Sequence, residues 1–234
     1  MKRFAIIVAG GSGTRMGAAI PKQFLELHGK PILLYSVDAF FNAYPDMQVI
    51  IVLPQSHLEA GQEMLISHGY RHNKIELKAG GPTRFHSVQN GLAAVDGDAI
   101  VFIHDAVRCL VSPQLIKRCG DAAAQTGSAI PIIKVRDSMR QMATDGSSKV
   151  IGREDLRIVQ TPQTFYASII KEAFALDYRD EFTDEASVLE YTGKTVTLVE
   201  GEESNLKITF KEDLDYASWK LQNQGPLSSP DCIR

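Results

Sequence analysis

Cysteine, charge of one sign and long apolar runs are all scarce in this sequence of 234 residues. Its three cysteines are odd in number and widely spaced, which excludes a disulfide framework and favours a reducing cytoplasm. The net charge of −3 lacks the excess of basic residues that binding to nucleic acid or to an anionic membrane requires. No apolar run approaches a transmembrane span, and the first is too short for a secretion signal. We therefore expect a cytoplasmic protein with neither a nucleic-acid nor a membrane partner.

What is present is the composition of an ordinary globular domain, with 44% hydrophobic and 23% charged residues. In the first half, apolar runs typical of strands buried on both faces alternate with segments of helical spacing. The expected strands are 3–9, 49–53, 99–103 and 128–133, and the expected helices are 32–41, 55–67, 84–95 and 112–125. This alternation predicts a Rossmann-like α/β fold, in which a mostly parallel sheet carries helices on both faces.

The alternation ends at residues 134–160, where short β-like pieces flank the turn cluster TDGSS. We expect a protruding β-hairpin arm here, whose apolar residues need cover, most economically from a second subunit. Beyond it we expect helices near 167–177 and 184–192, strands at 195–201 and 206–209, and a last helix after Lys211. A single domain is expected to span 1–222, with the arm inserted in it, and the tail 223–234 is expected to be disordered.

Four glycines follow the first expected strand, in the stretch IIVAGGSGTRMG. A glycine-rich turn after a buried strand lets backbone N–H groups approach an anion closely. The Walker pattern does not fit, because its spacing from Gly10 reaches Arg15 and no Lys-Ser/Thr pair follows. The dinucleotide pattern places Met16 where its third glycine is needed, and no acidic residue closes the second strand. Neither of the two common phosphate-binding templates therefore explains the loop.

What remains is a glycine turn followed by two cations, Arg15 and Lys22. A triphosphate carries more charge than a dinucleotide, and it needs more neutralisation when the bond between its phosphates is to break. The plainer interpretation is a tight turn with two solvated cations. Phosphate binding is favoured over it, and whether the bound compound also reacts is left open by these residues alone.

The loop together with PKQF at 21–24 resembles the signature of the cytidylyltransferases that form CDP-linked polyols, specifically the 2-C-methyl-D-erythritol 4-phosphate cytidylyltransferase family. Further segments recur in the order of that family: GGPTRFHSVQNGL, HDAVR, VRDSM, QTPQTF, TDEASVLE and EGEESNLKIT. The resemblance covers about Lys2 to Leu221. It implies an enzyme that depends on Mg²⁺ or another divalent cation and takes CTP and a polyol phosphate, and a homodimer formed through the 134–160 arm.

By their residues alone, the same segments also allow plainer interpretations. Asp105 and Arg108 can pair to cap a loop at the end of a strand, although strand ends in a parallel sheet are also where ligands bind. Thr183 is a good helix N-cap, with no full capping box because Ala186 stands three residues on. Lys207 in a short strand, and Arg153 in the arm, would be ordinary exposed charges.

The resemblance implies a nucleotide site and a cationic site for catalysis. The residues matched to CTP binding are Ala9, Gly10, Gly11, Gly13, Gly81 and Ser87, with Arg84 as a supporting cation. The residues matched to catalysis are Arg15, Lys22 and Lys207, which face the phosphates.

The resemblance also implies a polyol-phosphate site, in which Asp105 contacts the polyol near the metal-bound phosphates and is the candidate metal contact. Arg153 would enter the neighbouring subunit to hold the substrate phosphate, helped by Ser138 where the family has Thr. The full set is Asp105, Arg108, Ser138, Arg153, Thr161 and Thr183.

The implied reaction joins the phosphate of methylerythritol 4-phosphate to the α-phosphorus of CTP and releases pyrophosphate. A phosphate monoester is largely dianionic at neutral pH, so this nucleophile needs no general base, in keeping with the absence of a Ser-His or Cys-His pattern. The alternatives are a sister enzyme that uses ribitol 5-phosphate or another pentitol phosphate, a non-catalytic nucleotide-binding module and, more distantly, a dinucleotide-dependent oxidoreductase.

Overall fold

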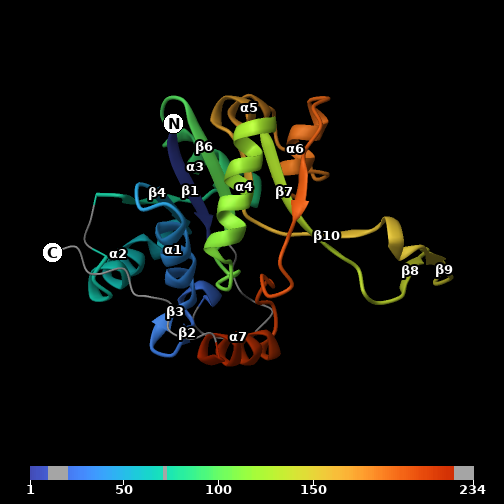
Figure 1. The fold of residues 1–234 in the computed structure, drawn as a ribbon, viewed down its shortest axis with the longest axis horizontal. Coiled ribbons are helices and arrows are strands. Elements are labelled where there is room, and N and C mark those ends of the chain that lie inside the picture. The colour runs from blue at the N-terminus through green and yellow to red at the C-terminus, as the bar shows by residue number, and fades with distance from the viewer. Residues whose placement is uncertain (10–20, 71–72, 224–234) are drawn as a thin grey trace.

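A mixed sheet lies at the centre of the structure, a computed structural model that describes residues 1–9, 21–70 and 73–223 (Figure 1). Its strand order is β10-β7-β11-β6-β1-β4-β5, with β12 paired to β7. The neighbours β5, β4, β1 and β6 are parallel, whereas β11 and β10 run antiparallel to the strands beside them. The strands are β1 (Lys2–Val8), β4 (Gln48–Leu53), β5 (Ile75–Ala79), β6 (Ala99–Asp105), β7 (Ser128–Lys134), β10 (Arg157–Val159), β11 (Gln163–Tyr166) and β12 (Leu198–Glu200).

Helices cover both faces of the sheet, as the alternation of the sequence predicts. The core on one face is completed by α1 (Ile32–Ala43), α2 (Leu58–Ser67) and α4 (Pro113–Thr126). The core on the other face is completed by α3 (Arg84–Ala93), α5 (Ala167–Ala173) and α6 (Glu185–Tyr191). Along β1, Ile7 belongs to the first core and Ile6 to the second, and both are fully buried. Successive side chains of a strand point to opposite faces, so a sheet covered twice requires the continuous apolar runs.

A third, smaller hydrophobic cluster lies apart from these two cores. Its buried members are Leu27, Ile32, Cys109, Leu110, Ile208 and Ala217. They come from the short hairpin of β2 (Glu26–Leu27) and β3 (Lys30–Pro31), from the start of α1, from the loop after β6, from the segment before α7, and from α7 (Lys211–Asn223). This cluster therefore packs the segments that carry Arg108 and Lys207 against the hairpin that follows Lys22.

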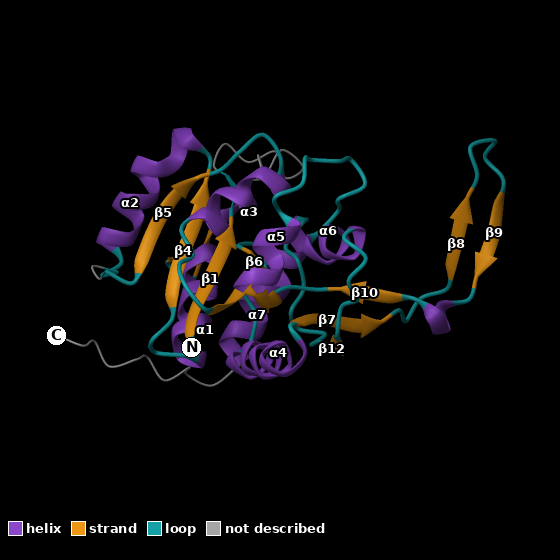
Figure 2. Ribbon diagram, turned by 90° about the horizontal axis from the view of Figure 1, so that it is seen from above, coloured by secondary structure: helices purple, strands orange, loops and turns teal. Residues whose placement is uncertain are grey.

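The predicted arm is a hairpin of β8 (Met139–Met142) and β9 (Ser148–Ile151), and Figure 2 shows it standing away from the sheet. Its apolar side chains are open to solvent in the single chain, with Val150 71% and Met142 66% exposed. The hairpin itself is confirmed, and its cover by a second subunit stays a prediction.

Two expectations about local structure are wrong. Residues 206–209 form no strand: toward the other described segments they make a single backbone–backbone bond, from the N–H of Ile208 to the carbonyl of Val107 at 3.0 Å. The apolar side chains of this stretch pack into the third cluster rather than onto a sheet face, so the apolar pattern alone misidentified it. The N-cap of α6 is Asp184 rather than Thr183. The capping box does exist, since Asp184 and Ser187 accept hydrogen bonds from each other's backbone N–H groups.

Candidate active site

The candidate site lies where β1 and β6 end side by side. These strands are parallel, Val8 pairs with Asp105, and the N–H of Ala106 donates to the carbonyl of Val8 at 3.0 Å. The chain leaves β1 toward α1 on one face of the sheet, whereas it enters β6 from α3 on the other face. Open α/β sheets bind their ligands at such a switch point. Ala9 also lies here, and the predicted Gly10, Gly11, Gly13 and Arg15 follow it outside the described residues.

Asp105, at the end of β6, is surrounded by three cationic side chains. Its Oδ1 lies 3.2 Å from Nη2 of Arg84, and its Oδ2 lies 3.0 Å from Nζ of Lys207 and 3.5 Å from Nε of Arg108. Burial alone would raise the pKa of Asp105, but Arg84, Lys207 and Arg108 outweigh it and hold that pKa well below its usual range. Asp105 is therefore ionised at neutral pH. We call these four residues the Asp105 cluster.

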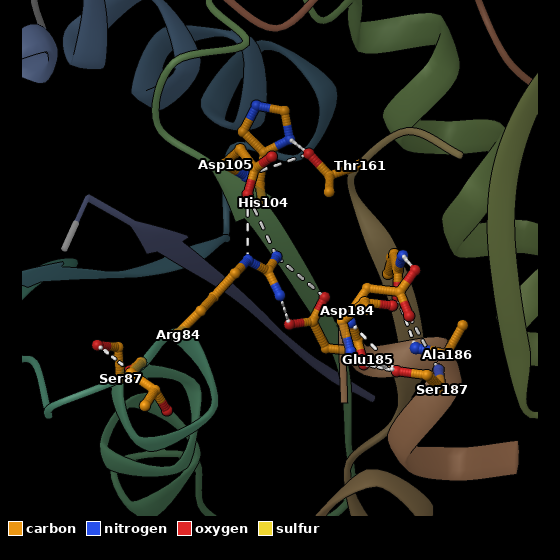
Figure 3. Close-up of polar contacts among 12 residues, drawn as sticks. Arg84, Ser87, His104, Asp105, Thr161, Asp184, Glu185, Ala186 and Ser187 are labelled. Carbon is orange, nitrogen blue, oxygen red and sulfur yellow. Dashed lines mark hydrogen bonds and ion pairs between the residues drawn. The ribbon is translucent and has the colours of Figure 1, made fainter. Parts of the chain in front are cut away.

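Arg84 connects the Asp105 cluster to helix α6, as Figure 3 shows. Its guanidinium contacts Oδ1 of Asp105 on one side and both carboxylate oxygens of Glu185 on the other, with Nη2 3.2 Å from Oε2. Glu185 is fully buried, and a buried carboxylate requires a charged partner. Burial tends to lower the pKa of Arg84, but the two carboxylates raise it, so the guanidinium stays charged. These contacts place Arg84 beside Asp105. Glu185 was not among the site residues that the sequence predicted.

The start of α6 is fixed by a buried amide from the neighbouring strand. The side chain of Gln163, in β11, donates to Oδ2 of Asp184 at 2.9 Å and accepts from the N–H of Ala186 at 2.8 Å. Glu185 lies between these two anchored residues and is held against Arg84. Thr183 is exposed just before the helix, and its N–H donates to the Ser187 hydroxyl at 3.1 Å.

Thr161 and His104 form a hydrogen-bond chain that ends on the backbone N–H of Asp105. The Thr161 hydroxyl accepts from the N–H of Asp105 at 3.1 Å and lies 3.0 Å from Nδ1 of His104, while Nε2 of His104 lies 3.2 Å from the carbonyl of Arg108 (Figure 3). The carbonyl accepts only, so Nε2 carries the proton and Nδ1 accepts from Thr161. Burial lowers the pKa of His104 to about 4, and the ring is neutral at neutral pH. Thr161, expected to bind substrate, is used here to orient Asp105.

Arg108, which was also expected to bind substrate, is largely engaged within the protein. Its Nη1 donates to the carbonyl of Asn205 at 2.8 Å, and its Nη2 donates to the carbonyl of Val159 at 3.4 Å. Only 8% of the residue is exposed. Arg108 therefore joins three separate segments around Asp105: the end of β10, the loop after β6 and the segment before α7.

Lys22 and Lys207 approach the same part of the molecule from opposite ends of the chain. Nζ of Lys22 donates to the carbonyl of Thr209, two residues beyond Lys207, and Lys22 is only 8% exposed. Lys207 is half exposed on its side chain while it pairs with Asp105. That these two cations face one phosphate site stays a prediction, and the third predicted member, Arg15, lies outside the described residues.

The predicted nucleotide-binding residues Ala9, Gly81 and Ser87 border the same edge of the sheet. The Ser87 hydroxyl accepts from the N–H of Gly81 at 3.1 Å and donates to the carbonyl of Thr83 at 3.0 Å, so it shapes this turn. A Cβ on Gly81 would lie 2.3 Å from Cβ of His86, which leaves room only for glycine. Ala9 is tied down by Gln23, whose buried side chain donates to the Ala9 carbonyl at 2.8 Å. Gln23 belongs to the PKQF signature but was not selected as a site residue.

Ser138 and Arg153 lie in the exposed arm, and within this chain neither forms a hydrogen bond or ion pair with the Asp105 cluster. Nη1 of Arg153 donates to the carbonyl of Arg136 at 2.6 Å, and Arg136 pairs with Glu203 at 2.7 Å. The single chain thus leaves both residues available to a neighbour.

The described residues contain no group of three His, Cys, Asp or Glu side chains that could hold a metal ion. Within the described residues, Asp105 is the carboxylate of the Asp105 cluster, and the nearby carboxylate of Glu185 is buried against Arg84. Mg²⁺ is often held by a single carboxylate together with substrate phosphates, so this donor set fits an ion that arrives with a nucleotide.

Among the residues that the structure describes, no helix is both long enough and apolar enough to cross a membrane.

A mostly parallel α/β sheet, with a glycine-rich sequence after β1 and cations gathered round a carboxylate at the switch point, is typical of a nucleotide-handling enzyme of the nucleotidyltransferase class. The family model of IspD, described as 2-C-methyl-D-erythritol 4-phosphate cytidylyltransferase, matches residues 4–223. The chain belongs to this family.

Similar proteins agree over nearly the whole chain. Two relatives named 2-C-methyl-D-erythritol 4-phosphate cytidylyltransferase, from Bacteroides fragilis and Phocaeicola vulgatus, are 44% and 43% identical over 93% of this chain and over 99% and 98% of their own. Crystal structures of proteins with that name show the same fold. The one from Thermus thermophilus is 30% identical, with a TM-score of 0.76 over 95% of this chain and 100% of its own. The one from Francisella tularensis is 31% identical, with a TM-score of 0.77 over 94% of this chain and 100% of its own.

Proposed function

We propose that the Asp105 cluster, with Lys22 and Arg15, catalyses transfer of the cytidylyl group of CTP to 2-C-methyl-D-erythritol 4-phosphate. A phosphate oxygen of the polyol phosphate attacks the α-phosphorus of CTP, the bond to the β-phosphate oxygen breaks, and pyrophosphate leaves. The product is 4-diphosphocytidyl-2-C-methyl-D-erythritol, an intermediate of non-mevalonate isoprenoid precursor biosynthesis. The observation that carries this proposal is the ion pair of Lys207 and Asp105 at the switch point, 3.0 Å between Nζ and Oδ2.

The nucleophile requires no general base, because a phosphate monoester has a second pKa of about 6 and is largely dianionic at neutral pH. The titratable groups at the site match this demand. Asp105 is ionised and held by cations, and His104 is buried, neutral and engaged in two hydrogen bonds. Asp105 and His104 therefore keep the site in its orientation and charge balance, and neither has to accept a proton from the nucleophile.

The principal barrier is the repulsion between two polyanions, together with the charge that builds up at phosphorus. Lys22, Lys207 and Arg15 would offset that charge, which is the largest contribution that fixed cations make in phosphoryl transfer. As Lys207 turns toward the incoming phosphates, Oδ2 of Asp105 becomes available to a polyol hydroxyl. Arg84 would meanwhile keep Oδ1 in place, so that Asp105 retains its orientation.

Mg²⁺ would be held by Asp105 together with phosphate oxygens of CTP, and it would supply further neutralisation of the triphosphate. The base of CTP would lie against Ala9 and Gly81, near the turn that Ser87 shapes. Thr183, exposed at the start of α6, would border the polyol.

We also propose a homodimer in which the arm of one subunit covers the site of the other. The exposed apolar side chains of the arm support this arrangement, since a monomer rarely leaves such a hairpin uncovered. Arg153 and Ser138 would then hold the substrate phosphate across the interface.

The experiment incubates the enzyme and Mg²⁺ with each of the four nucleoside triphosphates, in parallel with methylerythritol 4-phosphate and with ribitol 5-phosphate. Pyrophosphate release and the coupled product are both measured. We expect turnover with CTP and methylerythritol 4-phosphate, and at least tenfold less with any other pair. Preference for ribitol 5-phosphate would support the sister enzyme, and binding of CTP without pyrophosphate release would refute the catalytic assignment.

A further inference from the structure

The segment that carries Lys207 has neither helix nor strand between β12 and α7. Among the described residues, two backbone–backbone hydrogen bonds join it to neighbouring segments: the N–H of Gly201 donates to the carbonyl of Ile132 at 2.8 Å, and the N–H of Ile208 donates to the carbonyl of Val107. A stretch without a hydrogen-bonded ladder needs other bonds to keep one conformation. Lys207 is nevertheless positioned to within an ion-pair distance of Asp105.

Two buried amide side chains supply several of those bonds, beside the bonds that Lys22 and Arg108 donate to the carbonyls of Thr209 and Asn205. Gln160 pairs with the backbone of Glu202, donating to its carbonyl at 2.8 Å and accepting from its N–H at 3.1 Å. Nδ2 of Asn205 donates to the carbonyl of Thr161 at 2.8 Å. Gln160 is 2% exposed and Asn205 is fully buried. We call Gln160 and Asn205 the amide clamp.

The amide clamp leads directly to Asp105. Thr161, whose carbonyl receives the Asn205 amide, accepts the N–H of Asp105 on its hydroxyl at 3.1 Å. Arg108, which pairs with Asp105, donates to the carbonyl of Asn205 at 2.8 Å. Asn205 is thus connected to Asp105 twice, once through Thr161 and once through Arg108. It also lies two residues before Lys207 in the sequence. Its Oδ1 has no partner among the described residues, so its donor amide is the part that the structure uses.

We propose that Asn205, assisted by Gln160, is a positioning residue that acts through Lys207. The amide clamp fixes the backbone before Lys207, and the bond from Ile208 to Val107 fixes the backbone after it. The ammonium group of Lys207 is therefore already in position when the phosphates bind. This inference rests on the proposed role of Lys207. A purely structural role for Asn205 would instead affect folding and would act independently of Lys207.

A double-mutant cycle separates these two roles. The variants are N205A, K207A and N205A/K207A, assayed for kcat and for KM toward each substrate, with thermal unfolding measured on the same samples. We expect K207A to lose on the order of 10²–10³ in kcat/KM, as after removal of one charge-stabilising group. N205A should lose about tenfold, since a small displacement of a positioned group already reduces rate. The double variant should be no worse than K207A within about twofold, because the effects of coupled residues are not additive.

Gln89 provides the matched control. Its side chain donates to the carbonyl of Phe174 at 2.9 Å, which is the same kind of bond between two segments, but it joins α3 to the end of α5. We expect Gln89→Ala to lower the unfolding temperature about as much as Asn205→Ala while leaving kcat/KM within about twofold of the wild type.

Additive losses, with the double variant about tenfold below K207A, would overturn the positioning role. Full activity of K207A would instead refute the proposed function of Lys207, so the two failures are distinguishable. If Asn205→Ala does not fold, Gln160→Ala enters the same cycle, because it releases the backbone of Glu202 and one bond to the Asn205 carbonyl while keeping the Asn205 side chain and its bond to Thr161. Additive losses in that cycle would overturn the proposal equally.

Discussion

The ammonium group of Lys207 lies 3.0 Å from Oδ2 of Asp105. One residue ends a central strand and the other lies in a segment without regular structure near the C-terminus. Arg84 and Arg108 hold the same carboxylate, so the site has an organised positive charge before any substrate binds. When Lys207 turns toward the phosphates, Arg84 and Arg108 keep the carboxylate oriented, so little of the cluster has to rearrange, and charges fixed in advance are the most effective in catalysis.

Lys22→Ala should abolish most turnover while leaving the fold intact. The lost cation should reduce kcat/KM on the order of 10²–10³, measured as pyrophosphate release. The lost hydrogen bond to Thr209 should cost about 1 kcal/mol, which is roughly 2–4 °C in unfolding temperature for a domain of this size. Lys30→Ala is the control, because Lys30 is also partly buried and pairs with Asp38. Near-normal turnover of Lys22→Ala would contradict the assignment.

His104 should make the protein sensitive to acid. Its pKa is about 4 in the folded state against 6.5 in the unfolded chain, because burial disfavours the charged ring. Between pH 6.5 and pH 4 the unfolded chain carries a proton on His104 that the folded protein does not. The free energy of unfolding therefore falls as the pH is lowered through this range, and the contribution of His104 to stability is fully present above pH 6.5. The loss between pH 7 and pH 4.5 should be roughly 2–3 kcal/mol, measured by urea unfolding.

His104→Gln tests that origin of the acid sensitivity. Its amide can still donate to the Arg108 carbonyl, but it does not titrate. The variant should lack this part of the pH dependence, whatever its stability at pH 7. If variant and wild type lose stability in parallel, His104 is not the responsible group.

Arg84→Met should destabilise the protein strongly, because it leaves the carboxylate of Glu185 buried without its cation. Removal of one partner of a buried ion pair costs about 3–5 kcal/mol, whereas replacement of both by apolar residues is often close to neutral. The double variant Arg84→Met with Glu185→Leu should therefore recover most of the stability in urea unfolding. Its KM for the polyol phosphate should stay raised, because Oδ1 of Asp105 has lost its anchor. A double variant no more stable than Arg84→Met would show that the pair is not the cause.

The arm can be tested by mixing two inactive variants. If Arg153 acts in the neighbouring subunit, Arg153→Ala and Lys207→Ala should each be nearly inactive alone. Hybrid dimers formed by subunit exchange contain one intact site, so an equal mixture should regain up to roughly a quarter of wild-type activity. Sedimentation of the mixture checks that it is dimeric. A dimeric mixture that exchanges subunits and stays inactive would place Arg153 in its own chain's site.

Much of the fold was predictable because its signals are local. The strands at 3–9, 49–53, 99–103 and 128–133 are all present, since continuous apolar runs between helical patterns require a doubly covered sheet. The helices expected at 167–177 and 184–192 are shorter than predicted, as α5 and α6. The start of α6 was misplaced by one residue, because several residues in TDEAS can cap a helix and only backbone geometry selects Asp184.

The site was predictable where a motif stands at a strand end, as with Ala9 and Asp105. It was not predictable where a residue works through burial: Glu185, His104, Gln23 and Asn205 stand inside the quoted motifs, but nothing in the sequence shows what each of them contacts. Arg84 illustrates the same limit, because the resemblance implied only a supporting cation, and its contacts with Asp105 and Glu185 came from the tertiary structure.

The sequence by itself determined the layered α/β architecture, the glycine-rich loop after the first strand, the hairpin arm and the family, because these depend on residue patterns that are contiguous along the chain. Only the tertiary structure decided that Arg84, Arg108 and Lys207 converge on one carboxylate, and that amide side chains rather than a strand hold Lys207 in place. The physical reason is that a charge acts over a few ångströms in space, and the residues within that distance here come from segments that only packing brings together.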